Sequence, residues 1–357
     1  MTRNVKKVLF IGLGAIGQRH LRNLMALKGA DVEILAYRVR NLPHTISPEL
    51  TILDDNLTGR YPIKVFKDLS LALNQQPTAV FICNPTSLHI PPAIEAAKAG
   101  CHIFMEKPLS HSLEGIEELS AICKQKKLIF FVGYQLRFHP CYKLLKSLIQ
   151  EKKAGALLSV RVEIGEYLPG THKYEDYRQM YAAREDLGGG AVLSLIHEID
   201  YLYDLFNMPT KVFAMGGKLS SLQVDTEDCV EALLEMNYQN KYLPVSLHMD
   251  FFQRPAVRRC VVIGEEGRIT MDLAGLEVKI EKPDAKNNET HHFKDFQRND
   301  LFVEELKSFL QCVEENTRPP VTLEEGLKSL RIALSIKQSL TTGKVVDLSE
   351  NKHVSLV

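Results

Sequence analysis

The sequence predicts an α/β protein in which an N-terminal doubly wound parallel sheet is followed by an α+β domain with a large open, mostly antiparallel sheet. In the first part, from Val8 to Gly133, short apolar segments alternate with helix-compatible segments, a pattern typical of parallel sheets. After residue 157, segments that alternate polar and apolar residues follow one another with turns and no helices between them, as in antiparallel sheets. We therefore divide the 357 residues into domains at 1–134 and 135–300 and C-terminal helices at 301–345, the last of which we expect to brace the first domain.

The first apolar segment runs directly into a glycine-rich turn. Gly12, Gly14 and Gly17 follow the strand with G-x-G-x-x-G spacing, and a helix-compatible segment comes next. In such a turn the first glycine permits the bend, the second lets a pyrophosphate approach the backbone, and the third lets the helix pack closely on the strand. The strand, turn and helix together predict a Rossmann dinucleotide-binding domain, although a βα turn without a ligand is the alternative.

The second strand, expected at 31–37, ends without an acidic residue. An acidic residue about 20 residues beyond the glycines holds the ribose hydroxyls in NAD-binding domains. Here Tyr37 occupies that position, and Arg38 and Arg40 follow it. Because an arginine there can pair with a 2′-phosphate, we expect NADP(H) to be favoured over NAD(H). The alternative is that both arginines are only surface charges.

Two later strands also end in polar residues. We expect residues 41–64 to be irregular and 68–74 to form a short helix. The strand at 78–83 ends in the loop Asn84–His89, and the strand at 102–105 ends in Glu106, Lys107 and Pro108. Because ligands of doubly wound sheets bind beyond the carboxyl ends of strands, both endings are candidate cofactor contacts.

The second domain carries a second group of candidate residues. The segment at 191–206 has a helical pattern that would place Ser194, His197 and Asp200 on one face. His197 is a candidate general acid or base because imidazole titrates near neutral pH, and a purely structural histidine is the alternative. Tyr167 and Arg178 lie in a segment rich in polar aromatic residues, which suits a pocket for a hydroxylated or acidic ligand.

These motifs resemble the glucose-fructose oxidoreductase / inositol dehydrogenase family, called Gfo/Idh/MocA. The matching motifs are Gly12-x-Gly14-x-x-Gly17, Asn84–His89, Glu106-Lys107-Pro108, the segment 133–140, Gly188–Gly190 leading to His197 and Asp200, and Gly264-x-x-Gly267. The resemblance implies an NAD(P)-dependent oxidoreductase. Such an enzyme would transfer a hydride between the nicotinamide cofactor and a hydroxyl or carbonyl carbon of a sugar-like substrate: a polyol, a sugar acid or a nucleotide sugar.

The resemblance also implies individual roles. In such enzymes the lysine of the Glu-Lys-Pro motif lies between nicotinamide and substrate, which implies a catalytic role for Lys107. Glu106 would contact the nicotinamide ribose, and the Lys107–Pro108 bond is expected to be cis. The family more often has an aspartate four residues before the histidine, whereas Ser194 stands three residues before His197. This departure puts the usual acid–base partnership in doubt.

The complete set of candidates combines residue chemistry with the resemblance. The catalytic candidates are Lys107 and His197. The candidate cofactor-binding residues are Gly12, Gly14, Ala15, Ile16, Gly17, Arg38, Asn84, Pro85, Thr86, His89, Glu106, Lys107 and Gln135. The candidate substrate-binding residues are Lys107, Arg137, Tyr167, Arg178, Ser194 and His197.

Composition restricts the partners and the location. Lys plus Arg and Asp plus Glu both total 44, so no net charge favours nucleic acid or an anionic membrane surface. The seven cysteines include no C-x-x-C pair, which indicates reduced thiols in the cytoplasm, and no Cys/His spacing predicts a metal site. An open sheet commonly packs against another subunit, so we expect a homo-oligomer, either a dimer or a tetramer.

Two other functions stay open. Because fold does not fix function, the chain could be a catalytically silent dinucleotide-binding sensor or scaffold, which the serine at position 194 would favour. It could also be an enzyme that keeps a tightly held cofactor in a closed redox cycle.

Overall fold

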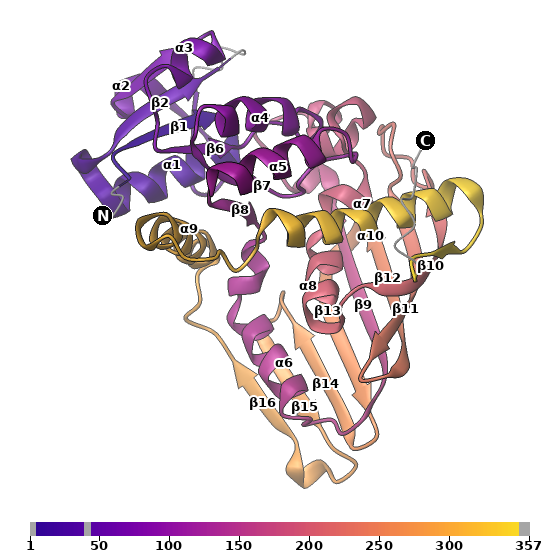
Figure 1. The fold of residues 1–357 in the computed structure, drawn as a ribbon. Coiled ribbons are helices and arrows are strands. Elements are labelled where there is room, and N and C mark those ends of the chain that lie inside the picture. The colour runs from indigo at the N-terminus through magenta and orange to yellow at the C-terminus, as the bar shows by residue number, and fades with distance from the viewer. Residues whose placement is uncertain (1–4, 39–43, 350–357) are drawn as a thin grey trace.

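The computed structural model describes residues 5–38 and 44–349, which form two sheets joined by a short crossing segment (Figure 1). The first sheet has six parallel strands in the order β5-β2-β1-β6-β7-β8. Its strands are β1 (Lys7–Ile11), β2 (Glu33–Tyr37), β5 (Ile63–Phe66), β6 (Ala79–Ile82), β7 (His102–Glu106) and β8 (Phe130–Gly133). The strand order reverses between β1 and β6, so the expected doubly wound fold is confirmed.

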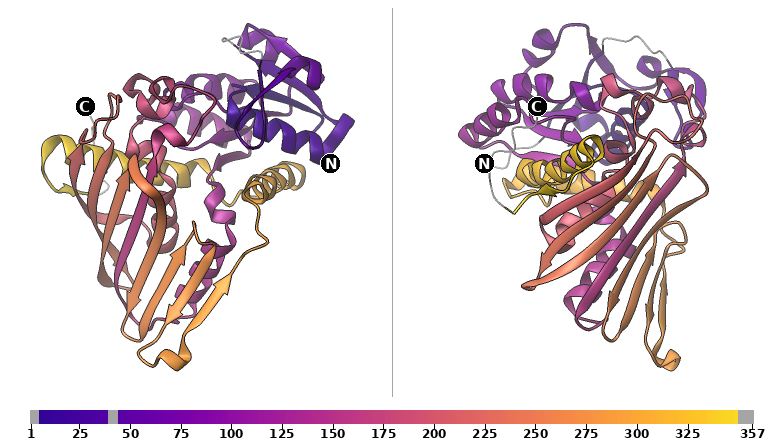
Figure 2. Two further views of the ribbon diagram at one scale, coloured as in Figure 1. Left: turned by 180° about the vertical axis from the view of Figure 1, so that it is seen from behind. Right: turned by 90° about the vertical axis from the view of Figure 1, so that its right-hand side faces the viewer.

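Helices lie on the two faces of this sheet (Figures 1 and 2). Short 3-10 helices stand in some of the connections between these helices and the strands. They are α1 (Ala15–Lys28), α3 (Leu69–Leu73), α4 (Ile90–Lys98) and α5 (Ile116–Lys126). The strands between them are buried along almost their whole length, which explains why they are nearly continuous apolar runs in the sequence.

The segment expected to be irregular, 41–64, is instead largely ordered. Its described part forms the antiparallel pair β3 (His44–Ile46) and β4 (Ile52–Asn56), the short helix α2 (Leu57–Arg60) and the start of β5. The expectation was wrong because β4 carries two aspartates and β5 is a four-residue edge strand with exposed residues, so neither resembles a buried strand. Arg40 lies outside the described residues.

The second sheet has nine strands in the order β16-β15-β14-β13-β9-β12-β11-β10-β17. They are β9 (Leu157–Tyr167), β10 (Pro209–Gly217), β11 (Cys229–Tyr238), β12 (Lys241–Asp250), β13 (Phe252–Gly264), β14 (Gly267–Asp272), β15 (Glu277–Glu281), β16 (Glu289–His292) and β17 (Val346–Asp347). Among the described strands of this second sheet, only β9 and β12 pair in parallel. The expected mostly antiparallel sheet is therefore confirmed.

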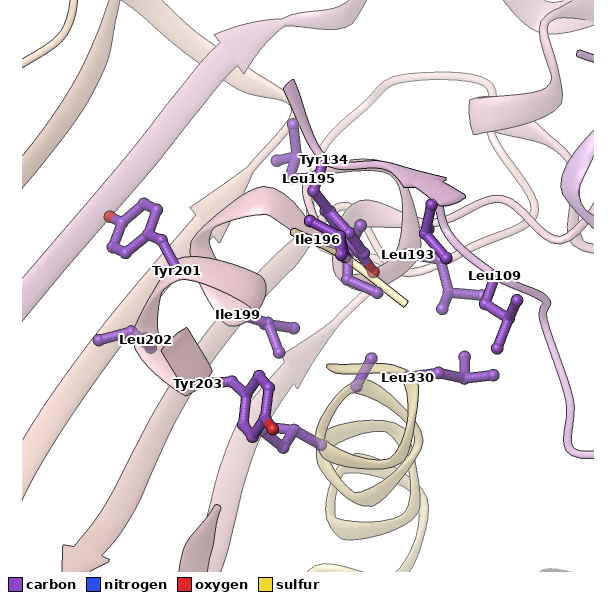
Figure 3. Packing of buried hydrophobic residues seen from close by; sticks show 14 of the residues in the cluster. Leu109, Tyr134, Leu193, Leu195, Ile196, Ile199, Tyr201, Leu202, Tyr203 and Leu330 are labelled. Atoms are coloured by element: carbon purple, nitrogen blue, oxygen red, sulfur yellow. The ribbon is translucent and has the colours of Figure 1, made fainter. Parts of the chain in front are cut away.

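One face of the second sheet is covered by helices α6 (Pro140–Gln150), α8 (His197–Phe206) and α10 (Leu323–Thr342). In the part of the chain that the structure describes, the other face carries no helix (Figure 2). Figure 3 shows how α10 closes the covered side: Leu330 packs toward the cluster formed by Leu193, Ile196 and Tyr134.

Helix α9 (Arg298–Glu315) returns to the first sheet after the second is complete. Its apolar residues Leu306 and Phe309 belong to the same buried cluster as Phe81 and Phe104 of β6 and β7. Helix α10 lies mainly along β10 and α8, and it touches β8 where Gly326 approaches Val132. The core of the N-terminal sheet is therefore completed by residues about 200 positions later in the chain.

The segment 191–206 forms two helices rather than the single one expected. Helix α7 (Ala191–Ser194) ends before Leu195, whose φ of −96° and ψ of 24° are not helical, and α8 begins at His197. Ser194 and His197 therefore belong to different helices, and the helical spacing used in the sequence analysis does not apply to them.

Candidate active site

The glycine turn opens onto free space at the start of α1. Gly12 has a φ of +88°, and a Cβ there would lie 2.8 Å from the Asn84 nitrogen, while one on Gly17 would lie 2.3 Å from the Gly12 oxygen. A Cβ on Gly14, in contrast, would have no heavy atom within 4 Å. The first turn of α1 also contains no acidic residue. The helix N-terminus therefore has the space and the polarity that a dinucleotide pyrophosphate requires.

His89 connects two of the predicted loops. Its ring is buried, with Nδ1 2.9 Å from the Pro108 oxygen and Nε2 2.9 Å from the Asn84 oxygen. Burial lowers the pKa of His89, so the neutral ring donates to one carbonyl at a time. In this arrangement His89 braces the Asn84–His89 loop against the turn that carries Lys107.

The loop that starts at Asn84 also meets the glycine triplet of the second domain. A Cβ at Gly188 would lie 3.0 Å from the Thr86 Cβ and 2.8 Å from the Cβ of His111. Thr86 is buried under this contact, and Pro85 precedes the short 3-10 helix that begins at Thr86. The two domains therefore touch through backbone that only glycine allows at this point.

Glu106 faces a buried histidine that sequence reasoning missed. Its Oε1 lies 2.7 Å from His20 Nε2, and its Oε2 accepts a hydrogen bond from the Lys107 amide at 3.2 Å. Glu305 of α9 is fully buried nearby and has no hydrogen-bond partner among the described residues. Burial, and then the charge of Glu106, raise the pKa of Glu305. His20 lies three residues after Gly17, so its position one helical turn along α1 could have identified it. No motif near Glu305 in the sequence indicates that it lies close to Glu106.

Lys107 and His197 meet where the two domains join. The Lys107–Pro108 bond is cis, and Lys107 Nζ donates a 2.7 Å hydrogen bond to the carbonyl oxygen of Ser194. His197, three residues later, is 5% exposed and its Nδ1 has no partner among the described groups. The edge of the Tyr134 ring is next to it, with centroids 5.9 Å apart. Lysine and imidazole thus lie close together without a hydrogen bond between them.

His197 is surrounded by positive charge. Burial, followed by the charges of Lys107, Arg258 and Arg298, lowers the pKa of His197 well below its usual value. The ring is therefore neutral at physiological pH and can accept a proton. The adjacent ammonium of Lys107 can polarise a carbonyl or stabilise an alkoxide.

Several buried polar atoms at this site have no partner within residues 5–38 and 44–349. They are Ser194 Oγ, His197 Nδ1, Gln135 Oε1 and Asn84 Oδ1. An unsatisfied buried polar group costs about 1–3 kcal/mol, so such a cluster is expected where a bound ligand or ordered water provides partners. Two of these four residues, Asn84 and Gln135, were predicted from the sequence to bind cofactor, and the other two, Ser194 and His197, to bind substrate. A nicotinamide nucleotide therefore fits the residues that are present.

Arg137, a predicted substrate residue, is engaged within the protein. Its Nε and Nη2 donate to the two carboxylate oxygens of Asp200, each at 2.8 Å, and its Nη1 donates to Asp204 at 3.2 Å. Ser329 of α10 also donates to Asp200, at 2.9 Å. The structure thus places Arg137 in a clamp that joins the crossing segment to α8 and α10.

The remaining predicted residues lie around the edges of the site. Tyr167 is half-buried with the guanidinium of Arg254 4.1 Å above its ring, and Arg178 is exposed and bonded to Asp176. Arg38 follows β2, and its amide donates to the Phe66 oxygen. Ile16 packs on the small cluster of Leu136, Leu301 and Phe302, and Ala15 starts α1. Within the described residues, no contact joins Tyr167 or Arg178 to Lys107 or His197.

Two arginines, Arg258 and Arg298, contribute to the positive charge that acts on His197. Arg258 of β13 donates from Nε and Nη2 to the fully buried Glu198, both at 2.8 Å. Arg298 is the first residue of α9. Arg298 belongs to a helix that begins about 100 residues after His197, a distance that no local pattern spans.

Comparison with known proteins places this geometry in a family. The model of an oxidoreductase family with an NAD-binding Rossmann fold matches residues 6–134, and the model of the GFO/IDH/MocA C-terminal domain matches residues 142–270. The chain belongs to the GFO/IDH/MocA family of oxidoreductases, which confirms both the resemblance and the enzyme class predicted from the sequence.

The relatives and solved structures reported next cover from 76% to 97% of this chain. The chain is 26% identical over 353 residues to myo-inositol 2-dehydrogenase of Thermotoga maritima, covering 95% of this chain and 98% of the relative. It is 24% identical over 278 residues to D-xylose 1-dehydrogenase [NADP(+)] of Haloarcula marismortui, covering 76% and 74%. The crystal structure of myo-inositol 2-dehydrogenase from Lactobacillus plantarum superposes with a TM-score of 0.77 at 22% identity, covering 97% and 99% of the two chains, and shares the fold.

Proposed function

We propose that this protein transfers a hydride between a nicotinamide cofactor and a hydroxyl or carbonyl carbon of a sugar-like substrate. One observation carries the proposal: Lys107, tied to the Ser194 carbonyl, lies beside a buried, neutral His197 that has an unpartnered ring nitrogen. An ammonium and a neutral imidazole at one point are suited to stabilising and deprotonating a reacting hydroxyl.

The residues divide the work as follows. The Gly12–Gly17 turn and the N-terminus of α1 hold the pyrophosphate, and His20 keeps the Glu106 carboxylate oriented for the nicotinamide ribose. The cofactor, when bound, gives or accepts the hydride. Lys107 stabilises negative charge on the reacting oxygen, and His197 takes the hydroxyl proton in oxidation or returns it in reduction.

Replacing Lys107 with Met tests the enzymatic function against the silent sensor. In the Lys107→Met protein we expect kcat across a panel of polyols, aldoses and sugar acids to fall by about 10²–10⁴ because charge stabilisation is lost. Its affinity for the dinucleotide should stay close to wild type. Lys241→Met, at an exposed hairpin, is the matched control. Wild-type protein that binds a dinucleotide but turns over no member of the panel would favour the sensor, and nicotinamide absorbance in the purified protein would favour a closed redox cycle.

We further propose a preference for NADP(H) over NAD(H). Arg38 directly follows the β2 carboxyl end and no acidic side chain stands there, which suits a 2′-phosphate. Titration of wild-type protein with NADPH and NADH should give the tighter dissociation constant for NADPH, and Arg38→Ala should remove the difference. A preference for NADH in the wild type would overturn this assignment.

The remaining proposals concern the domain boundaries, the oligomeric state and the location of the protein in the cell. We propose the division into 1–134, 135–300 and 301–345, assembly as a homo-oligomer through the open face of the second sheet, and a cytoplasmic location. The seven cysteines are all unpaired and buried, which is consistent with a reducing compartment. Among the described residues, no helix has the length and apolar character needed to span a bilayer.

A further inference from the structure

The Lys107 ammonium is anchored to a helix of only four residues. Its Nζ donates a 2.7 Å hydrogen bond to the carbonyl oxygen of Ser194, which is the last residue of α7 (Ala191–Ser194). His197 begins the next helix, α8. Because a single helical turn is not stable by itself, the position of α7 is set by its surroundings. Whatever holds α7 therefore also sets where the ammonium lies relative to the imidazole.

Glu227 holds the other end of α7. It lies in the connection between β10 and β11, and its backbone carbonyl accepts from the Ala191 amide at 2.9 Å. Its side-chain Oε1 accepts from the next amide, that of Val192, at 3.2 Å. The first amides of a helix have no partner inside the helix and carry partial positive charge, so a carboxylate suits this position.

The Glu227 carboxylate is also fixed from a second side. Nζ of Lys337, on α10, lies 3.1 Å from its Oε2, and the Glu227 side chain is only 11% exposed. Helix α10 packs against α7 (Figure 1). Because each carboxylate oxygen has its own partner, the side chain cannot rotate without losing one of the two contacts. The ion pair thus ties α7 to α10 as well as to the second sheet.

The last glycine of the triplet Gly188–Gly190 makes room for this contact. Gly190 has a φ of +99°, and a Cβ there would lie 2.3 Å from Oε1 and 2.6 Å from Oε2 of Glu227. A larger residue would push the carboxylate away from α7 and would be strained at this φ. The approach of Glu227 therefore gives a physical reason for glycine at this position of the motif.

Apolar packing does not replace these hydrogen bonds. Val192 and Leu193 of α7 are 0% and 1% exposed, so the helix is also held in the core by its side chains. Burial of apolar surface is not directional, however, whereas a hydrogen bond requires a set distance and angle. The bonds at its two ends, to Glu227 and from Lys107, therefore fix the direction of the Ser194 carbonyl.

We propose that Glu227 is a positioning residue of the active site: it holds the N-terminus of α7 and so fixes the Ser194 carbonyl that anchors the Lys107 ammonium beside His197. This inference rests on the proposed function and adds to it a residue that no motif of the sequence indicates. Glu227 acts through α7 and Lys107 and not on the reacting atoms.

Three variants of the full-length protein with bound dinucleotide test this role. Glu227→Ala removes the carboxylate, and kcat should fall by about tenfold or more, because small displacements of a catalytic group lower the rate strongly. Its dinucleotide affinity should stay close to wild type. Glu227→Gln keeps an oxygen that accepts from Val192, so it should recover most of the lost kcat. Asp284→Ala, which removes a capping carboxylate from an exposed turn after β15, is the matched control.

A second measurement separates positioning from a general loss of stability. Burial and then the charge of Lys107 lower the pKa of His197. An ammonium released from the Ser194 carbonyl can move into solvent, so the pKa of His197 should rise in Glu227→Ala. Loss of a carboxylate by itself would lower that pKa, because a negative charge favours the protonated ring. Histidine NMR titration measures the shift, with the His197 signal assigned by its absence in His197→Gln.

The outcomes distinguish this inference from the proposed reaction. Wild-type kcat in Glu227→Ala, a fall in kcat without a rise in the His197 pKa, or a loss of dinucleotide affinity overturns the positioning role and leaves the oxidoreductase intact. So does a Glu227→Gln protein as impaired as Glu227→Ala. A rise in the His197 pKa in Glu227→Ala, when the wild type turns over no member of the sugar panel, supports the positioning of Lys107 and counts against the proposed reaction.

Discussion

At the scale of single residues, the protonation state of His197 decides which proton transfers are open to this site. Its pKa is held well below 6.5 by burial and by three cations, so the ring is a base over the whole neutral range. Removal of one of the cations should raise the pKa of His197, because like charge opposes protonation of the ring, while the effect of burial stays. The pH dependence of the reaction is therefore a direct readout of the charges that surround His197.

We expect kcat/KM in the oxidative direction to stay flat with respect to His197 as the pH falls toward 6.5, and to decline only below it. In Arg298→Gln the acid limb should move to higher pH, because removal of a neighbouring positive charge makes protonation of His197 easier. The measurement is the pH profile of kcat/KM at saturating cofactor, compared with Arg318→Gln. An acid limb that does not move in Arg298→Gln would mean that the group titrating there is not His197.

At the scale of secondary-structure elements, a buried ion pair between Arg137 and Asp200 contributes to the joint between the domains. Arg137 and Asp200 are 8% and 2% exposed, and Asp200 is also bonded to Ser329 of α10. The pair fixes the crossing segment, α8 and α10 relative to one another. Since α8 begins at His197, this clamp also sets the position of the imidazole.

Asp200→Asn should reduce the free energy of unfolding by about 1–3 kcal/mol, because it removes the carboxylate that Arg137 binds with two hydrogen bonds and leaves Asp204 as the remaining counter-charge. Urea denaturation at neutral pH measures the loss. The control is Glu281→Gln, which breaks the exposed pair with Arg268 and should change stability little. If the two variants behaved alike, Arg137 would not be held by Asp200 in solution, and its predicted contact with substrate would regain support.

The same elements explain which parts of the fold and of the site could be predicted from the sequence. The strands β1, β6, β7 and β8 are short, buried, mostly apolar runs with glycine or polar endings, so the first sheet and the motifs at its edge were predictable. The break between α7 and α8 was missed because Leu195 and Ile196 are ordinary apolar residues, and only packing in the cluster of Figure 3 selects the turn there. Likewise Arg137 in isolation suggests a ligand contact. Its ion-pair partner, Asp200, is 63 residues away in the sequence. The sequence analysis placed Asp200 on a helical face with Ser194 and His197 and not beside Arg137.

At the scale of the whole molecule, the uncovered face of the second sheet exposes several large apolar side chains. Leu233 and Met215 are 61% and 65% exposed and lie on neighbouring strands, pointing away from the helices that cover the other face. Tyr242, 75% exposed, extends the row at the next hairpin. Exposed apolar residues that gather on one face of a sheet are typical of a subunit contact.

Leu233→Glu should therefore shift the protein to a smaller assembly, because it places a charge in the centre of that face. Light scattering coupled to size-exclusion chromatography gives the mass directly. Leu71→Glu, which changes an equally exposed leucine on α3 of the first unit, should leave the mass unchanged. A wild-type protein that elutes as a monomer would remove the basis for assembly through this face.

The late return of α9 has a consequence for how the protein is made. When the first six parallel strands have left the ribosome, Phe81 and Phe104 still lack the covering that Phe309 supplies, and Glu106 still lacks Glu305 behind it. The first domain therefore keeps an apolar surface exposed until most of the remaining chain has been translated. Because α9 comes so late in the chain, we expect chaperones to protect the first domain during synthesis. For the same reason, we expect a fragment truncated before α9 not to fold stably.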